Sequence, residues 1–281
     1  MGKTIAEKII ANAADRDSVL PGEIVTCAVD LAMIHDSGGP RRVQPAMEKL
    51  GIGLWDPEKI VLVSDHFAPC TDAESASILK LTREWAAENG INNFYDQLGI
   101  CHVVTPERGH LSPGMFAVGG DSHSPTGGAF GTYMFGIGAT DMLGVLVTGK
   151  TWIKVPQTIR INWSGELGIG IAAKDMALKM CASLGMDGGD YQAVQYSGTA
   201  IERLGMMERM TLCNMAAELG AQAGIVEPDE TTATYVTDAG GDPGNWAGFR
   251  SDPDASYKIT HDFDASNLPP QVAAPHTPAN A

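Results

Sequence analysis

The sequence has few cysteines, and no two of them form a C-x-x-C pair. Closely spaced cysteines in even number would indicate a disulfide framework, and paired C-x-x-C motifs would indicate a metal site. The chain instead has 5 cysteines, scattered along its length: Cys27, Cys70, Cys101, Cys181 and Cys213. We therefore expect neither a disulfide scaffold nor a zinc or iron–sulfur site built by these cysteines alone.

Long apolar runs are also missing. No segment approaches the roughly 18 consecutive apolar residues of a membrane-spanning helix. The first twenty residues carry charges where a signal peptide has its apolar centre. The sequence predicts a cytoplasmic protein with no membrane partner.

Positive charge is scarce: 19 Lys and Arg residues stand against 34 Asp and Glu residues, a formal net charge of −15. Such a chain repels the phosphate backbone of nucleic acids, so a nucleic-acid partner is not expected. Hydrophobic residues make up 44% and charged residues 19%, which is ordinary for a globular protein. A length of 281 residues suits one large or two medium domains.

Short β-branched runs alternate with segments of helical periodicity. The patterns predict strands over residues 23–30, 59–64, 100–104, 115–119 and 159–163, and helices over residues 4–14, 73–89 and 176–184. This alternation predicts an α/β fold with mostly parallel sheets. We expect an α/β domain over residues 1–160, a second α/β unit over 161–237, and a linker or tail over 238–281, where periodicity is lost.

Glycine is abundant, with 33 residues in the chain. Nine of them fall between Gly119 and Gly149. Glycine permits close backbone approach and left-handed conformations. We expect Gly127, Gly128 and Gly131 to let the backbone approach a cofactor or a substrate.

Histidines stand beside carboxylates at several predicted strand ends. The pairs are His35-Asp36, Asp65-His66, His102 with Glu107 five residues later, and Asp121-Ser122-His123. The carboxyl ends of parallel strands meet at one edge of a sheet, so these groups should converge. Adjacent imidazole and carboxylate groups set each other's charge state, which general acid–base catalysis requires.

Two other motifs are incomplete. Ser122 lies in Gly-Asp-Ser-His-Ser, which lacks the second glycine of the G-x-S-x-G motif of hydrolases. Gly136-Ile-Gly138 lacks the third glycine of a dinucleotide-binding motif, because Asp141 stands in that place. The sequence favours neither a serine hydrolase nor a nicotinamide enzyme.

Four segments together resemble the large subunits of the aconitase, homoaconitase and 3-isopropylmalate dehydratase family. They are SDHFAPCTDAESA at 64–76, GICHVVTPERGHLSPG at 99–114, the glycine-rich run at 119–161, and RMTLCNMAAELGAQAGIVEPDETT at 209–232. The resemblance covers essentially the whole chain, in order. It implies three-layer α/β/α domains with mostly parallel sheets around a deep active-site cleft.

The resemblance also implies roles for individual residues. Asp65 and His66 match the pair that assists the leaving hydroxyl, and His102 and Asp121 match a second histidine–carboxylate pair. The remaining matches are His123 and Glu218 as further catalytic groups, Asn214 as an amide close to the cofactor, Ser122 as a substrate-contacting residue, and His35 and Asp36 as a substrate-lining pair.

Members of this family use a [4Fe-4S] cluster held by three cysteines in SCTN-type and C-x-x-C motifs. Both motifs lie beyond the segment that here reads PQVAAPHTPANA, and neither is present in this chain. We therefore expect the ligands from a cluster-bearing C-terminal part or chain, toward which the predicted tail leads. The proton-abstracting serine and substrate-binding arginines of the family belong to a swivelling domain, usually a separate small subunit.

Two functional hypotheses remain from the sequence. In the first, the chain is part of a hydro-lyase large subunit, inactive when isolated, that acts on a hydroxy acid of the 2-alkylmalate type. Isopropylmalate is favoured; homocitrate, citrate or another 2-alkylmalate is the alternative substrate. In the second hypothesis, the chain is a clusterless member that uses the Asp/His cleft for binding or for a mononuclear metal.

Overall fold

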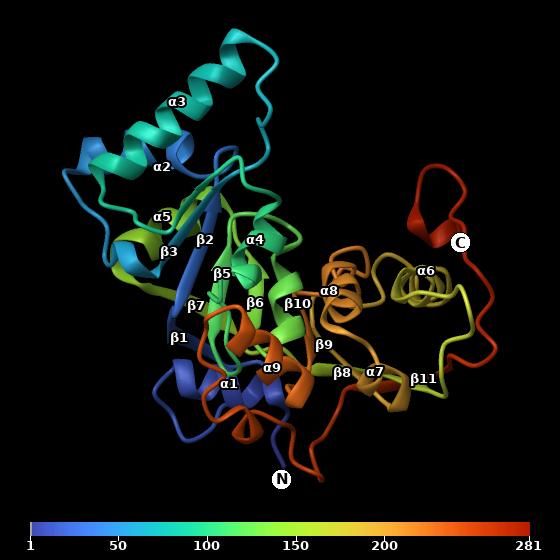
Figure 1. The fold of residues 1–281 in the computed structure, drawn as a ribbon. Coiled ribbons are helices and arrows are strands. Elements are labelled where there is room, and N and C mark those ends of the chain that lie inside the picture. Colours follow the sequence, from blue (N-terminus) through green and yellow to red (C-terminus); the bar gives the residue numbers. More distant parts are fainter. Residues whose placement is uncertain (1) are drawn as a thin grey trace.

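The computed structural model describes residues 2–281, and these residues form two parallel β-sheets covered by helices (Figure 1). The first sheet has the strand order β4-β3-β2-β5-β6. Its strands are β2 (Leu31–His35), β3 (Ile60–Ser64), β4 (Phe94–Asp96), β5 (Phe116–Gly119) and β6 (Tyr133–Gly136). Every neighbouring pair in this sheet is parallel, so all five strands end at the same edge.

Both faces of the first sheet are buried, as the apolar β-branched runs predict. Alternate residues of each strand point to opposite sides: Val61 and Val63 join one core, and Ile60 and Leu62 join the other. Helices α1 (Ile5–Ala13), α2 (Pro40–Leu50), α3 (Ala73–Glu88) and α5 (Ala139–Thr148) pack in the second core, and α4 (Cys101–Glu107) packs in the first. The fold is therefore α/β with helices on both faces of a parallel sheet, as expected.

The second sheet has the order β10-β9-β8-β11 and is also parallel. Its strands are β8 (Thr158–Ser164), β9 (Ala193–Ser197), β10 (Ala223–Val226) and β11 (Ile259–Asp264). Helices α6 (Ala173–Leu184) and α8 (Met206–Asn214) cover one face, to the right of the first sheet in Figure 1. Along β8 the apolar residues Ile159, Ile161 and Trp163 point into this core, which confirms the half-buried strand predicted there.

The remaining elements lie outside the two parallel sheets. An antiparallel ribbon pairs β1 (Ile24–Ala28) with β7 (Lys150–Lys154). The others are α7 (Thr199–Glu202), α9 (Glu230–Asp238) and the 3-10 helices η1 (Pro57–Lys59), η2 (Ser124–Phe130), η3 (Trp246–Gly248) and η4 (Pro278–Asn280). None of the helices in the described part of the chain combines the length and apolar character needed to cross a bilayer.

Three expectations about elements are wrong. In the segment 100–104, expected as a strand, helix α4 begins at Cys101, because a short apolar run does not distinguish strand from helix. The single strand expected over 23–30 covers β1 only, and β2 follows after the two residues Val29 and Asp30. The segment after residue 238 is not wholly a linker, since β11 pairs in register with β8.

The glycine-rich segment packs against protein rather than against a ligand. A Cβ at Gly128 would lie 1.7 Å from the carbonyl oxygen of Gly224, and one at Gly131 would lie 2.7 Å from Pro228. At Gly127 the nearest atom is the sulfur of Met134. The expected approach of these glycines to a cofactor or substrate is therefore wrong: they let η2 lie directly on β10 and β6.

Candidate active site

The candidate site lies at the carboxyl edge of the first sheet, where binding crevices of parallel sheets form. Strand β2 ends at His35, β3 leads into Asp65 and His66, and β5 leads into Gly120 and Asp121. Since β2 lies between β3 and β5, the three strands deliver their polar residues to one place.

His66 is held between carboxylates. Its Nδ1–H donates to Oδ1 of Asp65 at 2.6 Å, and its Nε2 lies 3.7 Å from Oδ2 of Asp121. Asp121 and Asp65 together raise the pKa of His66 to about 10, against the opposing effect of partial burial. His66 is therefore an imidazolium at neutral pH, and its Nε2–H faces Asp121.

Asp121 connects two histidines. Its Oδ1 accepts a hydrogen bond from Nε2 of His102 at 2.8 Å and another from the backbone N–H of His123 at 2.8 Å. The hydrogen bonds with His102 and His66 hold the pKa of Asp121 far below its usual range, although burial opposes this. His102 thus pairs with Asp121, and the sequence neighbour Glu107 is not its partner among the hydrogen bonds of residues 2–281.

The second carboxylate oxygen of Asp65 is also held by a hydrogen bond. Oδ2 accepts the backbone N–H of Cys101 at 2.7 Å, at the first residue of α4. Burial works to raise the pKa of Asp65, but the hydrogen bonds from His66 and Cys101 outweigh it, and the net pKa is lowered. Asp65 stays ionised and orients the His66 ring.

The second sheet contributes to the same site through α8 and the turn after it. Nε2 of His123 lies 3.0 Å from Oε1 of Glu218, and Nδ1 of His123 lies 3.1 Å from the Ser122 hydroxyl. The amide of Asn214 donates to the Thr126 hydroxyl at 3.0 Å. The other oxygen of Glu218 is buried and has no hydrogen-bond partner among the described residues.

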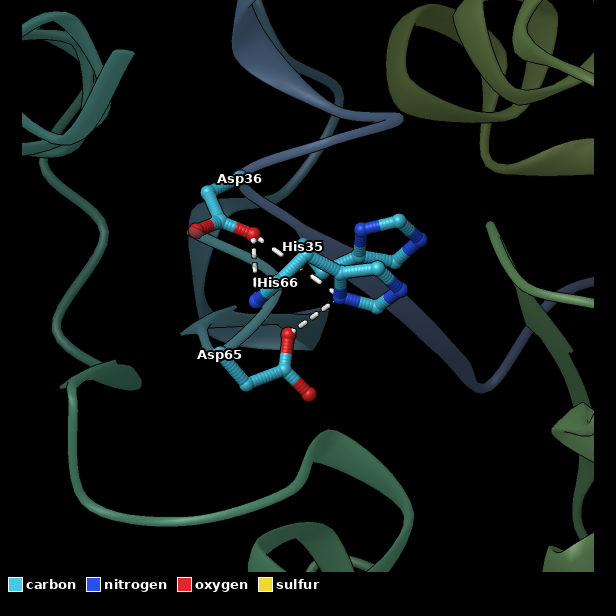
Figure 2. A group of neighbouring side chains, drawn as sticks. All are labelled: His35, Asp36, Asp65 and His66. Atoms are coloured by element: carbon cyan, nitrogen blue, oxygen red, sulfur yellow. Dashed lines mark hydrogen bonds and ion pairs between the residues drawn. The ribbon is translucent and has the colours of Figure 1, made fainter. Parts of the chain in front are cut away.

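His35 and Asp36 point inward rather than into open space (Figure 2). The ring of His35 stacks on the ring of His66, with centroids 3.9 Å apart and planes 11° from parallel. Asp36 is completely buried and accepts the backbone N–H groups of His66 and Phe67. Burial is the main reason that the pKa of His35 is lowered, so this second ring is neutral.

One atom each of His35, Asp36, Asp65 and His66 lie within 4.8 Å of one another, a spacing that a metal ion could use. Metal binding needs deprotonated ligands with free lone pairs. Here Nδ1 of His66 is hydrogen-bonded to Asp65, and both oxygens of Asp36 already accept N–H bonds. The arrangement suits proton handling better than metal coordination.

The cysteines of the chain do not fit a [4Fe-4S] cluster. Cys101, Cys181 and Cys213 are buried in one core, Cys27 is buried in the other, and Cys70 is exposed on a loop. Burial raises the pKa of the Cys27 thiol to about 12 and also raises that of Cys101, which disfavours the thiolate that iron requires. No cysteine belongs to a group of three or more metal-ligating residues within residues 2–281.

The structure brings most of the predicted site residues into contact with one another, whereas Asn214 reaches the group only through Thr126, whose hydroxyl donates to the carbonyl of His123. It also shows contacts that the sequence analysis missed. The Tyr95 hydroxyl donates to Nε2 of His110 at 2.5 Å beside the first sheet, and burial lowers the pKa of His110. Glu107 lies three residues before His110, but the sequence analysis paired that carboxylate with His102 and did not single out His110.

Comparisons with known proteins agree with this geometry. The profile of the aconitase family (aconitate hydratase) matches residues 7–281. The chain is 46% identical over its whole length to a 3-isopropylmalate dehydratase large subunit 1 from Methanopyrus kandleri, covering 66% of that protein. It is 44% identical over its whole length to a probable 3-isopropylmalate dehydratase large subunit from Methanothermobacter thermautotrophicus, covering 67% of it.

A third relative has a different printed activity. Over 96% of the chain, identity is 45% to a probable methanogen homoaconitase large subunit from Methanothermobacter thermautotrophicus, of which 64% is covered. The chain thus spans about two thirds of the length of the curated relatives it matches. On the profile match and these identities, the chain belongs to the aconitase family.

Proposed function

We propose that this chain is the acid–base part of a hydro-lyase large subunit that interconverts 2-isopropylmalate and 3-isopropylmalate through isopropylmaleate. The observation that carries the proposal is the Asp121 carboxylate, which faces His66 and His102 at once. Relatives named as 3-isopropylmalate dehydratase large subunits match this chain from end to end, which supports the choice of substrate.

Dehydration of a hydroxy acid breaks a C–O bond and an adjacent C–H bond and forms a C=C bond. The leaving hydroxyl needs a proton, and the charged His66 ring holds one at Nε2. Asp65 keeps the ring in place through Nδ1, so Nε2 is the atom that can donate. Hydration of the alkene at the neighbouring carbon returns the proton to the same nitrogen.

Negative charge and N–H donors lie next to Nε2 of His66. They belong to Asp121, His102 and the His123–Glu218 pair. We propose that Ser122 contacts a substrate carboxylate, because its hydroxyl lies at the exposed side of the site beside His123. Asn214 lies deeper, where its amide joins α8 to η2 through Thr126.

The chain needs partners for the whole reaction. We propose that the [4Fe-4S] ligands come from the part of the relatives' length that this chain does not cover, since its own thiols do not converge. A small subunit is proposed to bring the base that removes the C–H proton, because the relatives are named as large subunits.

Homoaconitase activity is the second candidate, favoured by the 45% identity to the probable homoaconitase subunit. The two candidates differ in the group on the hydroxy acid: a branched alkyl group or a longer carboxylate chain. Comparing kcat/KM for isopropylmalate and homocitrate in one preparation distinguishes them.

The test is a chimera in which residues 1–281 replace the matching part of the Methanopyrus kandleri large subunit, combined anaerobically with its small subunit. We expect the chimera to show dehydratase activity with isopropylmalate. Activity with citrate, the unbranched control substrate, should be well below it.

Asp121→Asn should lower kcat by about 10²- to 10⁴-fold, the usual effect of losing an acid–base group. Asp238→Asn, at an exposed aspartate of α9, is the matched control and should retain wild-type kcat. An Asp121→Asn chimera with more than half of wild-type turnover would sink the assignment.

A further inference from the structure

The carboxyl end of the central strand β2 carries two buried polar residues, His35 and Asp36. His35 is 4% exposed and Asp36 is fully buried, whereas the side chain of His66 is 36% exposed. A substrate entering the cleft would therefore meet His66 and little of either residue. Their polar atoms must be satisfied by protein, and the hydrogen bonds show which protein groups do so.

Asp36 uses both of its oxygens on the loop after β3. Oδ1 accepts the backbone N–H of His66 at 3.1 Å, and Oδ2 accepts that of Phe67 at 3.0 Å. The backbone N–H of Asp36 also donates to the carbonyl of Val63 in β3, so Asp36 is bonded to this segment through both its backbone and its side chain. Because Asp36 is fully buried, neither oxygen is accessible to a substrate hydroxyl.

His35 uses both of its nitrogens on the other side. Nε2–H donates to the carbonyl of Gly120 at 3.0 Å, directly before Asp121, and Nδ1 accepts the N–H of Gly38 at 3.3 Å. Only the neutral Nε2–H tautomer satisfies both bonds. His35 thereby joins β2 to the loop after β5.

The two loops held in this way carry the reacting groups. The loop after β3 carries His66 and the loop after β5 carries Asp121, whose carboxylate lies 3.7 Å from Nε2 of His66. The flat face of His35 also stacks on His66, which limits rotation of that ring. The His66–Asp121 separation therefore depends on how each loop is fastened to β2.

We propose that His35 and Asp36 are positioning residues: Asp36 fastens the loop after β3, His35 fastens the loop after β5, and together they set the His66–Asp121 geometry. This inference rests on the proposed function for its effect on catalysis, but not for its structural content. It replaces the expectation that the two residues line the substrate. A displacement of about 1 Å in such a pair is enough to lower a rate by about 10²-fold.

The first test needs no activity. In the 281-residue chain, NMR titration of the His66 ring should give a pKa of about 10 in the wild type. His35→Leu removes the bond to Gly120 and should lower the His66 pKa by more than about one unit, because Asp121 is the main cause of the raised value. His35→Gln keeps an N–H donor and should restore most of the shift.

Matched variants guard against misfolding. His110→Gln changes another part-buried histidine, hydrogen-bonded to Tyr95 and not to either loop, and should leave the His66 pKa unchanged. If His35→Leu does not fold, Gly38→Ala serves instead, because its Cβ would lie 3.2 Å from the Gly120 oxygen and 3.2 Å from His35 Cε1. Gly38→Ala should also lower the pKa of His66. An unchanged His66 pKa in the folded variant overturns the role of His35.

The role of Asp36 has its own readout. Asp36→Asn replaces one acceptor by a donor, so hydrogen exchange of the His66 or the Phe67 amide, whichever loses its acceptor, should become more than about tenfold faster. His35→Gln should leave both amides unchanged, since it acts on the opposite loop. Unchanged protection of both the His66 and Phe67 amides in Asp36→Asn would overturn the role of Asp36.

The active chimera then distinguishes positioning from binding. His35→Leu should lower kcat by about 10²-fold with KM within about threefold of wild type, and His35→Gln should recover much of kcat. A raised KM with unchanged kcat would mean that His35 binds substrate, and would overturn the proposal. A wild-type chimera without dehydratase activity would instead contradict the proposed function, while the NMR and exchange results would still decide the positioning roles.

Discussion

At the residue scale, the main property of the site is a proton held by His66 between ionised carboxylates. Asp65 and Asp121 each face one nitrogen of the ring, and Asp36 lies 3.8 Å from Nδ1. His35, whose ring stacks on that of His66, is neutral, so the two rings do not carry like charges. One charged and one neutral imidazole therefore lie face to face, each fixed by its own partners.

This charge state predicts a pH dependence of stability. The pKa of His66 is about 10 in the folded chain and near its ordinary value of 6.5 when unfolded. A raised folded pKa means that the stabilisation is fully present below pH 6.5 and is lost as pH rises toward 10. Urea midpoints of the wild type should therefore fall between pH 7 and pH 10 more steeply than those of His66→Gln. Parallel curves for the two proteins would show that the ring is not charged in the fold.

At the element scale, α8 and α9 are fastened by a buried ion pair. The guanidinium of Arg209 is fully buried and binds both oxygens of Asp229, which also caps the first turn of α9. Asn214 and Glu218 follow on or just after α8, so this pair helps to hold the second sheet's contribution to the site.

Removing one partner of this pair should be costly. Asp229→Ala leaves the Arg209 charge buried and unpaired and removes a helix cap, and we expect a loss of about 3–5 kcal/mol in the free energy of unfolding. The control is Glu166→Ala, which removes an ion pair with Arg203 in which both side chains are more than 60% exposed. That change should cost less than about 1 kcal/mol. Equal effects of the two substitutions on the urea midpoint would contradict the reasoning.

The contact of η2 with β10 gives a second prediction at this scale. Gly128→Ala would place a Cβ 1.7 Å from a backbone oxygen that cannot move freely, and should lower the unfolding free energy by about 1–3 kcal/mol or more. Gly144→Ala, in the exposed interior of α5 with open space around it, should instead raise it by about 0.5–1 kcal/mol. Chemical denaturation of both variants measures the difference. Opposite signs are the expected result, and a stabilising Gly128→Ala would contradict the close packing.

At the scale of the whole molecule, the two sheets share one core. Residues of β3 such as Val61 and Val63 belong to the same apolar cluster as Met176 of α6 and Tyr196 of β9. The domain boundary predicted near residue 160 falls within β8. Because the shared core joins both sheets, Asp121 of the first and Glu218 beside the second can keep a fixed geometry.

The thiols test, at the scale of the whole molecule, the proposal that the cluster ligands come from outside this chain. Four of the five cysteines are buried, so only Cys70 should react rapidly with a thiol reagent in the native chain, and the others only after unfolding. Cys70→Ser should abolish the fast phase. Anaerobic reconstitution of the 281-residue chain with iron and sulfide should leave far fewer than about four irons per chain. A stable four-iron product would show that these cysteines can rearrange into a ligand set.

The sequence by itself determined the α/β class, three of the helices and the buried strand of residues 59–64, and it predicted a list of site residues. Those features depend on local periodicity and on residues next to each other, such as Asp65-His66. The family resemblance also predicted the His102–Asp121 pair across 19 residues, and the structure places these side chains 2.8 Å apart.

Only the tertiary structure decided what each polar group touches. The start of α4 at Cys101 depends on the Asp65 carboxylate that receives its N–H, and β11 exists because β8 offers an edge for pairing. The glycines at 127–131 approach protein because η2 is pressed between β6 and β10. His35 and Asp36 point inward because β2 lies between the strands whose loops they hold, and strand order is a non-local property that no short pattern contains.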